Sequence, residues 1–192
     1  SMGLLSDEDR ALLWRGLIVQ KAVSQFIEDA HWGTIDYLLI DTPPGTGDIH
    51  MALARLLPQM TSLVVTIPAR AAQRVAARAA DFSRRHHIRV MGVIENMAPF
   101  HCVCGEVHAI FGSGGGDELA HELAVPLVGS IPLNDAVAHG GDTGEPAVGH
   151  DPALSKEFAH IVEWITSDLA PPRGMAGCSA RLLDAVEKAL EA

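Results

Sequence analysis

The amino-acid sequence predicts an α/β fold in which a parallel sheet carries helices on both faces. Short, continuously apolar runs bounded by turn residues recur along the chain, as is typical of strands buried on both faces. Longer segments with helical periodicity alternate with them, as strand–helix–strand units require. The chain of 192 residues is 48% hydrophobic but only 5% aromatic. This composition predicts a core of small aliphatic side chains, as suits helices packed on a parallel sheet.

The first part of the chain predicts two helices around one buried strand. Residues 6–29 begin with Ser followed by acids, a pattern that favours a helix N-terminus, and apolar residues then recur at helical spacing. Residues 37–40, Tyr-Leu-Leu-Ile, form the first predicted strand. We expect a short helix over residues 50–57, with Asp48 as its cap. The helix should end at residue 57, because Pro58 cannot continue it.

The rest of the chain continues the alternation. The expected elements are a strand over 62–67, a helix over 69–87, a strand over 90–95, a helix over 117–124, a strand over 126–131 and a helix over 154–165. We expect residues 101–111 to form a cysteine-bearing loop. Residues 134–152, rich in Gly, Pro and Asp, predict an irregular loop. We assign residues 1–168 to one domain and residues 169–192 to a linker and a short C-terminal helix.

Charge and composition limit the function classes. A formal net charge of −10 disfavours nucleic acid and anionic membranes as partners. No apolar run approaches the roughly 20 residues of a membrane span, and no signal-peptide pattern opens the sequence. The chain has three cysteines, and a single residue separates two of them. This odd number and spacing do not fit an oxidised secreted scaffold. We therefore expect a cytoplasmic protein with no nucleic-acid and no membrane partner.

Residues 41–48, Asp-Thr-Pro-Pro-Gly-Thr-Gly-Asp, carry the clearest functional pattern. Asp41 ends a predicted buried strand, where a carboxylate can lie beside a nucleotide-bound metal. Gly45 has no Cβ, so its backbone N–H can approach a terminal phosphate closely. The alternative is a tight strand-to-helix turn, since Pro and Gly mark turns in many proteins. A turn alone, however, does not require an acid at the strand end.

A family resemblance begins at this segment. Residues 35–48, IDYLLIDTPPGTGD, resemble the Walker B and switch II segment of the Mrp/ApbC proteins, MinD-like P-loop ATPases that bind and transfer iron–sulfur clusters. The resemblance continues through residues 92–97, 111–116 and 129–133, and reaches back to 14–16 and, more weakly, 2–5. It covers most of the chain up to about residue 164, and it implies a MinD-like P-loop NTPase fold.

One part of that fold has no counterpart in the sequence. The chain contains no G-x-x-x-x-G-K-[ST] phosphate loop. In the resembled family this loop and the first strands precede the switch segment. We therefore expect a partial P-loop ATPase domain whose N-terminal strands and phosphate loop are missing.

The resemblance implies nucleotide roles for four residues. Asp41 would be the Walker B acid that contacts Mg²⁺ through water, and Gly45 would sense the γ-phosphate of ATP. Asn96 matches the position whose side-chain amide reads adenine, and an amide offers the donor and acceptor that the adenine edge requires. An Asn that caps a turn after a strand is the alternative. Pro132 would line the base pocket, although a proline after a strand is also common for structural reasons.

Cys102 and Cys104 form the second functional pattern. Thiolates are soft ligands that select zinc, copper(I) or iron–sulfur clusters, but two cysteines cannot complete a four-thiolate site. The resemblance implies a homodimer in which each subunit contributes one pair to a bridging [4Fe–4S] cluster. The family has two residues between its cysteines, whereas this chain has one. A zinc site within one chain through His101 or His108 stays open, as do reduced cysteines that only fill a loop.

The sequence thus predicts an ATP-dependent iron–sulfur cluster carrier that acts as a homodimer and supplies apo iron–sulfur proteins. With its phosphate loop missing, the chain alone is expected to be inactive as an ATPase. A MinD- or ParA-like positioning ATPase is an alternative, but the MinD type attaches to membranes through a basic amphipathic helix. The predicted last helix, 181–191, is too acidic for that role. A non-catalytic metal-binding fragment is the third reading.

Overall fold

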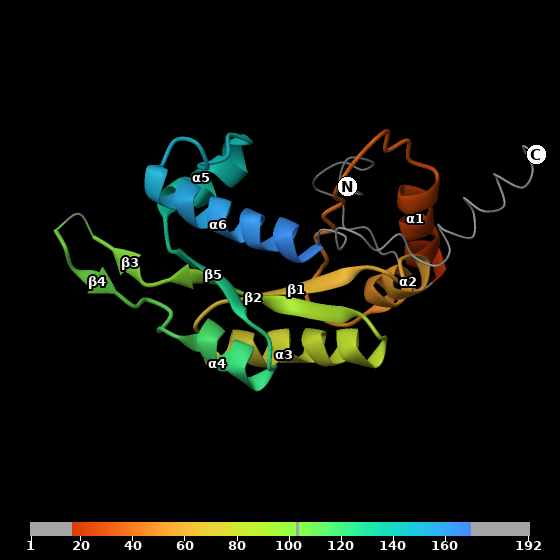
Figure 1. The fold of residues 1–192 in the computed structure, drawn as a ribbon, viewed down its shortest axis with the longest axis horizontal. Coiled ribbons are helices and arrows are strands. Elements are labelled where there is room, and N and C mark those ends of the chain that lie inside the picture. Colours follow the sequence, from red (N-terminus) through yellow and green to blue (C-terminus); the bar gives the residue numbers. More distant parts are fainter. Residues whose placement is uncertain (1–16, 103, 170–192) are drawn as a thin grey trace, which may run out of the picture.

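The computed structural model describes residues 17–102 and 104–169 (Figure 1). Its elements are α1 (Leu17–Glu28), α2 (Asp48–Leu56), β1 (Thr61–Thr66), α3 (Arg70–Arg85), β2 (Arg89–Ala98), β3 (Phe100–His101), β4 (Val107–His108), α4 (Gly115–Glu122), β5 (Leu127–Pro132), α5 (Asp135–Thr143) and α6 (Pro152–Leu169). The predicted C-terminal helix and the first part of the helix predicted over 6–29 lie outside the described residues. None of the helices in the described ranges has the length and hydropathy that a membrane span needs.

Three strands form a parallel sheet in the order β1–β2–β5. Val64 of β1 lies opposite Val93 of β2, and Glu95 of β2 lies opposite Ser130 of β5. β2 is the central strand, and its Val93 is fully buried. A strand covered on both faces explains its nearly continuous apolar run.

Helices cover both faces of this sheet (Figure 1). α3 and α4 pack on one face around Val64, Val93 and Leu119. α6 packs on the other face, where Leu154 and Ile161 meet residues of β2 and β5. The fold class predicted from the sequence is therefore confirmed.

Residues 134–152 are not the irregular loop that their composition predicts, because they contain α5. The Asn134 side chain caps this helix by accepting a hydrogen bond from Ala136 N at 2.9 Å. Gly144 adopts a left-handed conformation at the C-terminal end, as glycine allows. The prediction was wrong because the glycines and aspartates of this segment, which usually mark loops, here lie within and beside a short helix.

The predicted strand over residues 37–40 is also wrong. These residues run without regular structure, and Leu39 is 86% exposed. An extended segment becomes a strand only when its backbone groups bond to a neighbouring strand. In the described part of the chain, no strand lies beside residues 37–40, and β1 pairs with β2 alone.

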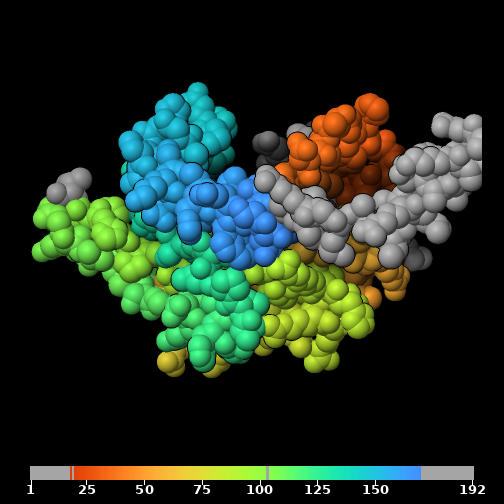
Figure 2. All heavy atoms as spheres, viewed as in Figure 1, coloured from red at the N-terminus to blue at the C-terminus, as the bar shows by residue number. Residues whose placement is uncertain are grey.

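The cysteine-bearing segment is more regular than predicted. β3 and β4 pair as a short antiparallel hairpin, with Phe100 opposite His108 and His101 opposite Val107. We call residues 99–112 the cysteine hairpin. It protrudes at one end of the molecule, opposite the end formed by α1 and α2 (Figures 1 and 2).

Candidate functional site

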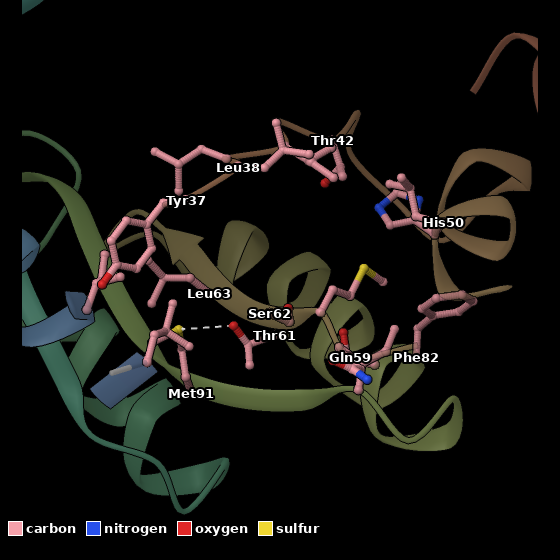
Figure 3. A pocket seen from close by; sticks show the side chains of 18 of the residues that line it. Tyr37, Leu38, Thr42, His50, Gln59, Thr61, Ser62, Leu63, Phe82 and Met91 are labelled. Carbon is pink, nitrogen blue, oxygen red and sulfur yellow. Dashed lines mark hydrogen bonds between the residues drawn. The ribbon is translucent and has the colours of Figure 1, made fainter. Parts of the chain in front are cut away.

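Two cavities of about 650 and 620 Å³ separate residues 36–45 from the edge strand β1. In the first cavity, Tyr37 and Leu38 face Leu63 and Met91 across the opening (Figure 3). The second cavity adjoins it and extends toward the carboxyl ends of β1 and β2, which is where ligands bind in open α/β sheets.

The second cavity brings together three of the residues predicted for nucleotide binding. Asp41 and Gly45 line it from the switch segment, and Asn96 lines it from β2. Gly45 has a φ of +102°, a conformation that side chains with a Cβ rarely adopt. The backbone at Gly45 therefore depends on glycine, as expected of a loop that must approach a ligand.

Asn96 lies in a β-bulge of β2. Glu95 pairs with Ser130 and Ala98 pairs with Pro132, so β2 has one residue more than β5 over this stretch. Met97, inside the bulge, has a φ of +53°, and its N–H donates to Asn96 Oδ1 at 2.9 Å. Bulges next to functional sites re-aim side chains. Here the local hydrogen bond engages the amide oxygen, and the NH₂ group is the donor that the Asn96 side chain can offer to a ligand.

Pro132 lies apart from this group. It pairs with Ala98 at the end of β5 and lines neither of the two cavities. Pro132 is connected to the predicted base pocket through its pairing with β2, the strand that carries Asn96.

His50 is a cavity residue that the sequence analysis did not single out. It lies in the first turn of α2, lines both cavities, and packs edge-on against Phe82 at 5.8 Å between ring centroids (Figure 3). Its Nδ1 is buried and has no hydrogen-bond partner among the described residues. Burial lowers the pKa of His50 below its ordinary 6.5, because desolvation disfavours the charged imidazolium. In the sequence, the feature that could have pointed to His50 is a histidine shortly after residues 41–48.

Cys102 and Cys104 lie between β3 and β4 in the cysteine hairpin, and neither lines the two cavities. Cys102 is half-buried, Cys104 is exposed, and both thiols are free. Cys104 N–H donates to Cys102 Sγ at 3.5 Å. A side-chain hydrogen bond with Cys102 lowers the pKa of the Cys104 thiol, with a further contribution from the backbone at Glu106. The more accessible cysteine is thus the one whose ligating thiolate form is favoured.

The neighbouring histidines do not complete a metal site with these thiols. His108 Nε2 lies 3.6 Å from Glu106 Oε2, and its ring stacks against Phe100. Within residues 17–102 and 104–169, no three His, Cys, Asp or Glu side chains converge on a common point. A single-chain zinc site through His101 or His108 is therefore not formed in this conformation.

Comparison with known proteins identifies the family. The model of the NUBPL iron-transfer P-loop NTPases, within the ParA group, matches residues 1–169. The chain belongs to this family. Proteins that this chain resembles include the iron–sulfur cluster carrier protein of Saccharolobus solfataricus, 42% identical over 164 residues, and that of Mycobacterium leprae, 38% identical over 190 residues.

These alignments cover 83% and 95% of this chain but 55% and 49% of the relatives. The NUBPL-family chain therefore spans about half the length of the curated relatives that it matches.

Solved structures agree on the fold. A nucleotide-binding protein from Archaeoglobus fulgidus, solved in complex with ADP and with cobalt, is 32% identical, with a TM-score of 0.59 over 67% of this chain and 54% of that one. The cell division ATPase MinD of Pyrococcus furiosus is 21% identical, with a TM-score of 0.55 over 78% of this chain and 57% of that one. The second likeness supports the MinD-like fold alone.

Proposed function

We propose that this chain is part of an ATP-dependent iron–sulfur cluster carrier, and that it holds the cluster between the cysteine hairpins of two copies. One observation carries the proposal: β2 leads from Asn96, on the nucleotide-side cavity, directly into the hairpin that presents Cys102 and Cys104. One strand thus connects the candidate base-reading residue to the candidate cluster ligands. The relatives from Saccharolobus solfataricus and Mycobacterium leprae are iron–sulfur cluster carrier proteins, which agrees with this assignment.

On the nucleotide side, Asp41, Gly45 and Asn96 would hold ATP and Mg²⁺. The Asp41 carboxylate suits a hydrated Mg²⁺, which prefers oxygen ligands and retains several waters. The backbone N–H at Gly45 suits an anionic phosphate. The Asn96 amide suits the edge of adenine, and the ADP bound in the Archaeoglobus fulgidus protein supports nucleotide at this fold. The sequence provides no phosphate-loop lysine, so turnover would need that group from another segment or chain.

On the cluster side, each chain would offer the two thiolates of Cys102 and Cys104. A [4Fe–4S] cluster takes four thiolate ligands, so two chains related by a two-fold axis would complete its coordination. The cluster is cargo in this proposal, and its recipients would be apo iron–sulfur proteins. An exposed, protruding hairpin suits hand-over, because a recipient can approach the ligands without the fold opening. We place this exchange in the reducing cytoplasm, where free thiols persist.

A transfer assay tests this function. The protein is reconstituted anaerobically with iron and sulfide, desalted, and mixed with an apo-ferredoxin, whose visible spectrum reports cluster arrival. We expect transfer to be faster than from equivalent free iron and sulfide, and to persist when a chelator is present. Transfer that the chelator abolishes, or protein that retains no iron, would contradict the proposal.

A further inference from the structure

Glu95 is a buried carboxylate in the apolar centre of the sheet. It follows four buried residues of β2 and is itself only 4% exposed. Its Oε2 accepts a hydrogen bond from Gly116 N at 2.6 Å, and its Oε1 accepts one from Ser130 Oγ at 3.2 Å. Burying a carboxylate is costly unless it is hydrogen-bonded. The two bonds explain how Glu95 is tolerated, but an apolar residue would fill the position without that cost.

The bond to Gly116 anchors the segment that returns from the cysteine hairpin to the sheet. Gly115 and Gly116 are buried at the start of α4. A Cβ at Gly116 would lie 2.5 Å from Glu95 Cβ, and a Cβ at Gly115 would collide with the backbone of Pro68. The glycine run over residues 112–116 therefore lets the returning chain approach β2 and the β1–α3 connection more closely than any side chain would permit.

The segment that leaves for the hairpin is anchored two residues beyond Asn96. Ala98 pairs with Pro132, and its carbonyl accepts a hydrogen bond from Leu133 N at 2.9 Å. The bulge that carries Asn96 thus lies between two anchors. Glu95 holds the returning segment, and Ala98 begins the outgoing one. Any displacement of the bulge changes the spacing of these two segments at the base of the hairpin.

We propose that Glu95 is a positioning residue: its carboxylate ties the returning segment at Gly116 to the strand that carries Asn96, and so fixes how the hairpin presents Cys102 and Cys104. The effect of Glu95 on the cluster rests on the function proposed above. The hydrogen bond between Glu95 and Gly116 does not depend on that function, because it is present in the metal-free chain. Glu95 touches neither nucleotide nor cluster in this role and acts through the backbone of the hairpin.

Five variants separate positioning from simple stabilisation. Glu95→Gln keeps an oxygen that can accept from Gly116 N–H, and its NH₂ group can donate to Ser130 Oγ, whereas Glu95→Ala loses both contacts. Gly116→Ala forces the returning segment away from β2 without changing Glu95. Gly141→Ala is the matched glycine control, because a Cβ there meets open space. A fifth variant, Leu154→Ala, removes a side chain that is 1% exposed in the core under α6 and thus destabilises the fold away from the hairpin.

Hydrogen exchange of the metal-free protein is the first measurement. We expect Gly116→Ala and Glu95→Ala to speed exchange of the hairpin amides, such as Cys102 N–H, at least about fivefold, since a buried hydrogen bond is lost or distorted. Glu95→Gln and Gly141→Ala should stay within about twofold of the wild type on the same grounds. Unchanged hairpin exchange in Gly116→Ala and Glu95→Ala would overturn the inference, whether or not the protein binds iron.

The lifetime of the reconstituted cluster is the second measurement, followed by its visible absorbance. We expect Glu95→Ala and Gly116→Ala to shorten it at least about fivefold and Glu95→Gln to restore it, because the presented thiolate geometry is what these variants change. If Leu154→Ala shortens the lifetime equally, the effect is general destabilisation and Glu95 has no positioning role. If the wild type holds no cluster, the proposed function fails, and the exchange measurement alone decides on the tie.

Discussion

We expect the metal-free protein to self-associate through the unpaired edge of β1, and we expect replacement of Val65 by lysine to weaken this association. β1 pairs with β2 on one side, and its other edge faces the two cavities with no strand partner in the described ranges. Val65 is 58% exposed there, although it is an apolar residue within a strand. Unpaired sheet edges recruit other strands, and a lysine on the edge opposes such pairing.

The size of the effect follows from the exposed area. Complete burial of a valine side chain contributes about 1.5–3 kcal/mol, so covering the exposed 58% of Val65 is worth about 0.9–1.7 kcal/mol for each chain. For one chain this corresponds to a factor of about five to twenty in the dissociation constant, and a dimer that covers Val65 on both chains squares that factor to about 25 to 400. The cost of burying the lysine charge adds to it. We therefore expect Val65→Lys to raise the dissociation constant at least about tenfold. Stability of the monomer should change by no more than about 0.5 kcal/mol, as for most exposed positions.

Sedimentation velocity over a concentration series, with a chelator present, measures this dissociation constant. Val162→Lys is the matched control, because Val162 is 56% exposed on α6 and lines neither cavity. The reasoning is refuted if Val65→Lys associates like the wild type, or if Val162→Lys weakens association to the same extent. In either case the edge of β1 would not be the associating surface.

Three further predictions concern the candidate site. The 192-residue chain should hydrolyse ATP no faster than its Asp41→Asn variant in a phosphate-release assay, because no phosphate-loop lysine stabilises the transition state; magnesium-dependent turnover that the substitution abolishes would contradict this. The alkylation of Cys104 by iodoacetamide should show a midpoint below the thiol's ordinary pKa, and Cys102→Ala should move it to higher pH by removing the hydrogen bond that lowers the pKa; coincident midpoints would be the contrary result. Because burial lowers the pKa of folded His50, the unfolded chain binds the proton first, so the free energy of unfolding should fall as pH drops below about 6.5. Urea titrations at several pH values should show a smaller fall in His50→Gln, and an equal fall would argue against burial of this group.

The sequence predicted the three strands of the sheet because each contains a run of mainly apolar residues. β2 is buried from Met91 to Glu95, β1 and β5 have shorter apolar stretches, and the positions of all three strands could be predicted to within a few residues. Residues 37–40 have the same pattern, but whether such a run becomes a strand depends on a neighbour, which local sequence does not reveal. α5 was missed for the opposite reason, since its glycines and aspartates favour loops and only the cap at Asn134 and its surroundings stabilise a helix there.

The candidate site likewise contains residues that could be predicted from the sequence and contacts that could not. Asp41 could be singled out because it follows an apolar run, where ligands meet parallel sheets. Gly45 could be singled out by its missing Cβ, and Asn96 by the family resemblance. The tie between Glu95 and Gly116 joins residues 21 positions apart and depends on how closely α4 packs on β2. The buried Nδ1 of His50 likewise depends on tertiary packing. Neither could be predicted from spacing, although a lone acid at the end of the apolar run 90–94 was a visible signal.

Native mass spectrometry of the anaerobically reconstituted protein bears directly on a cluster shared between two chains. We expect a species of two chains that holds four iron and four sulfide, as a bridging [4Fe–4S] cluster requires. Cys102→Ser and Cys104→Ser should each lose this species together with the metal-dependent dimer, because either substitution removes two of the four thiolates. One zinc ion on a single chain, or full iron retention by either variant, would contradict the shared cluster.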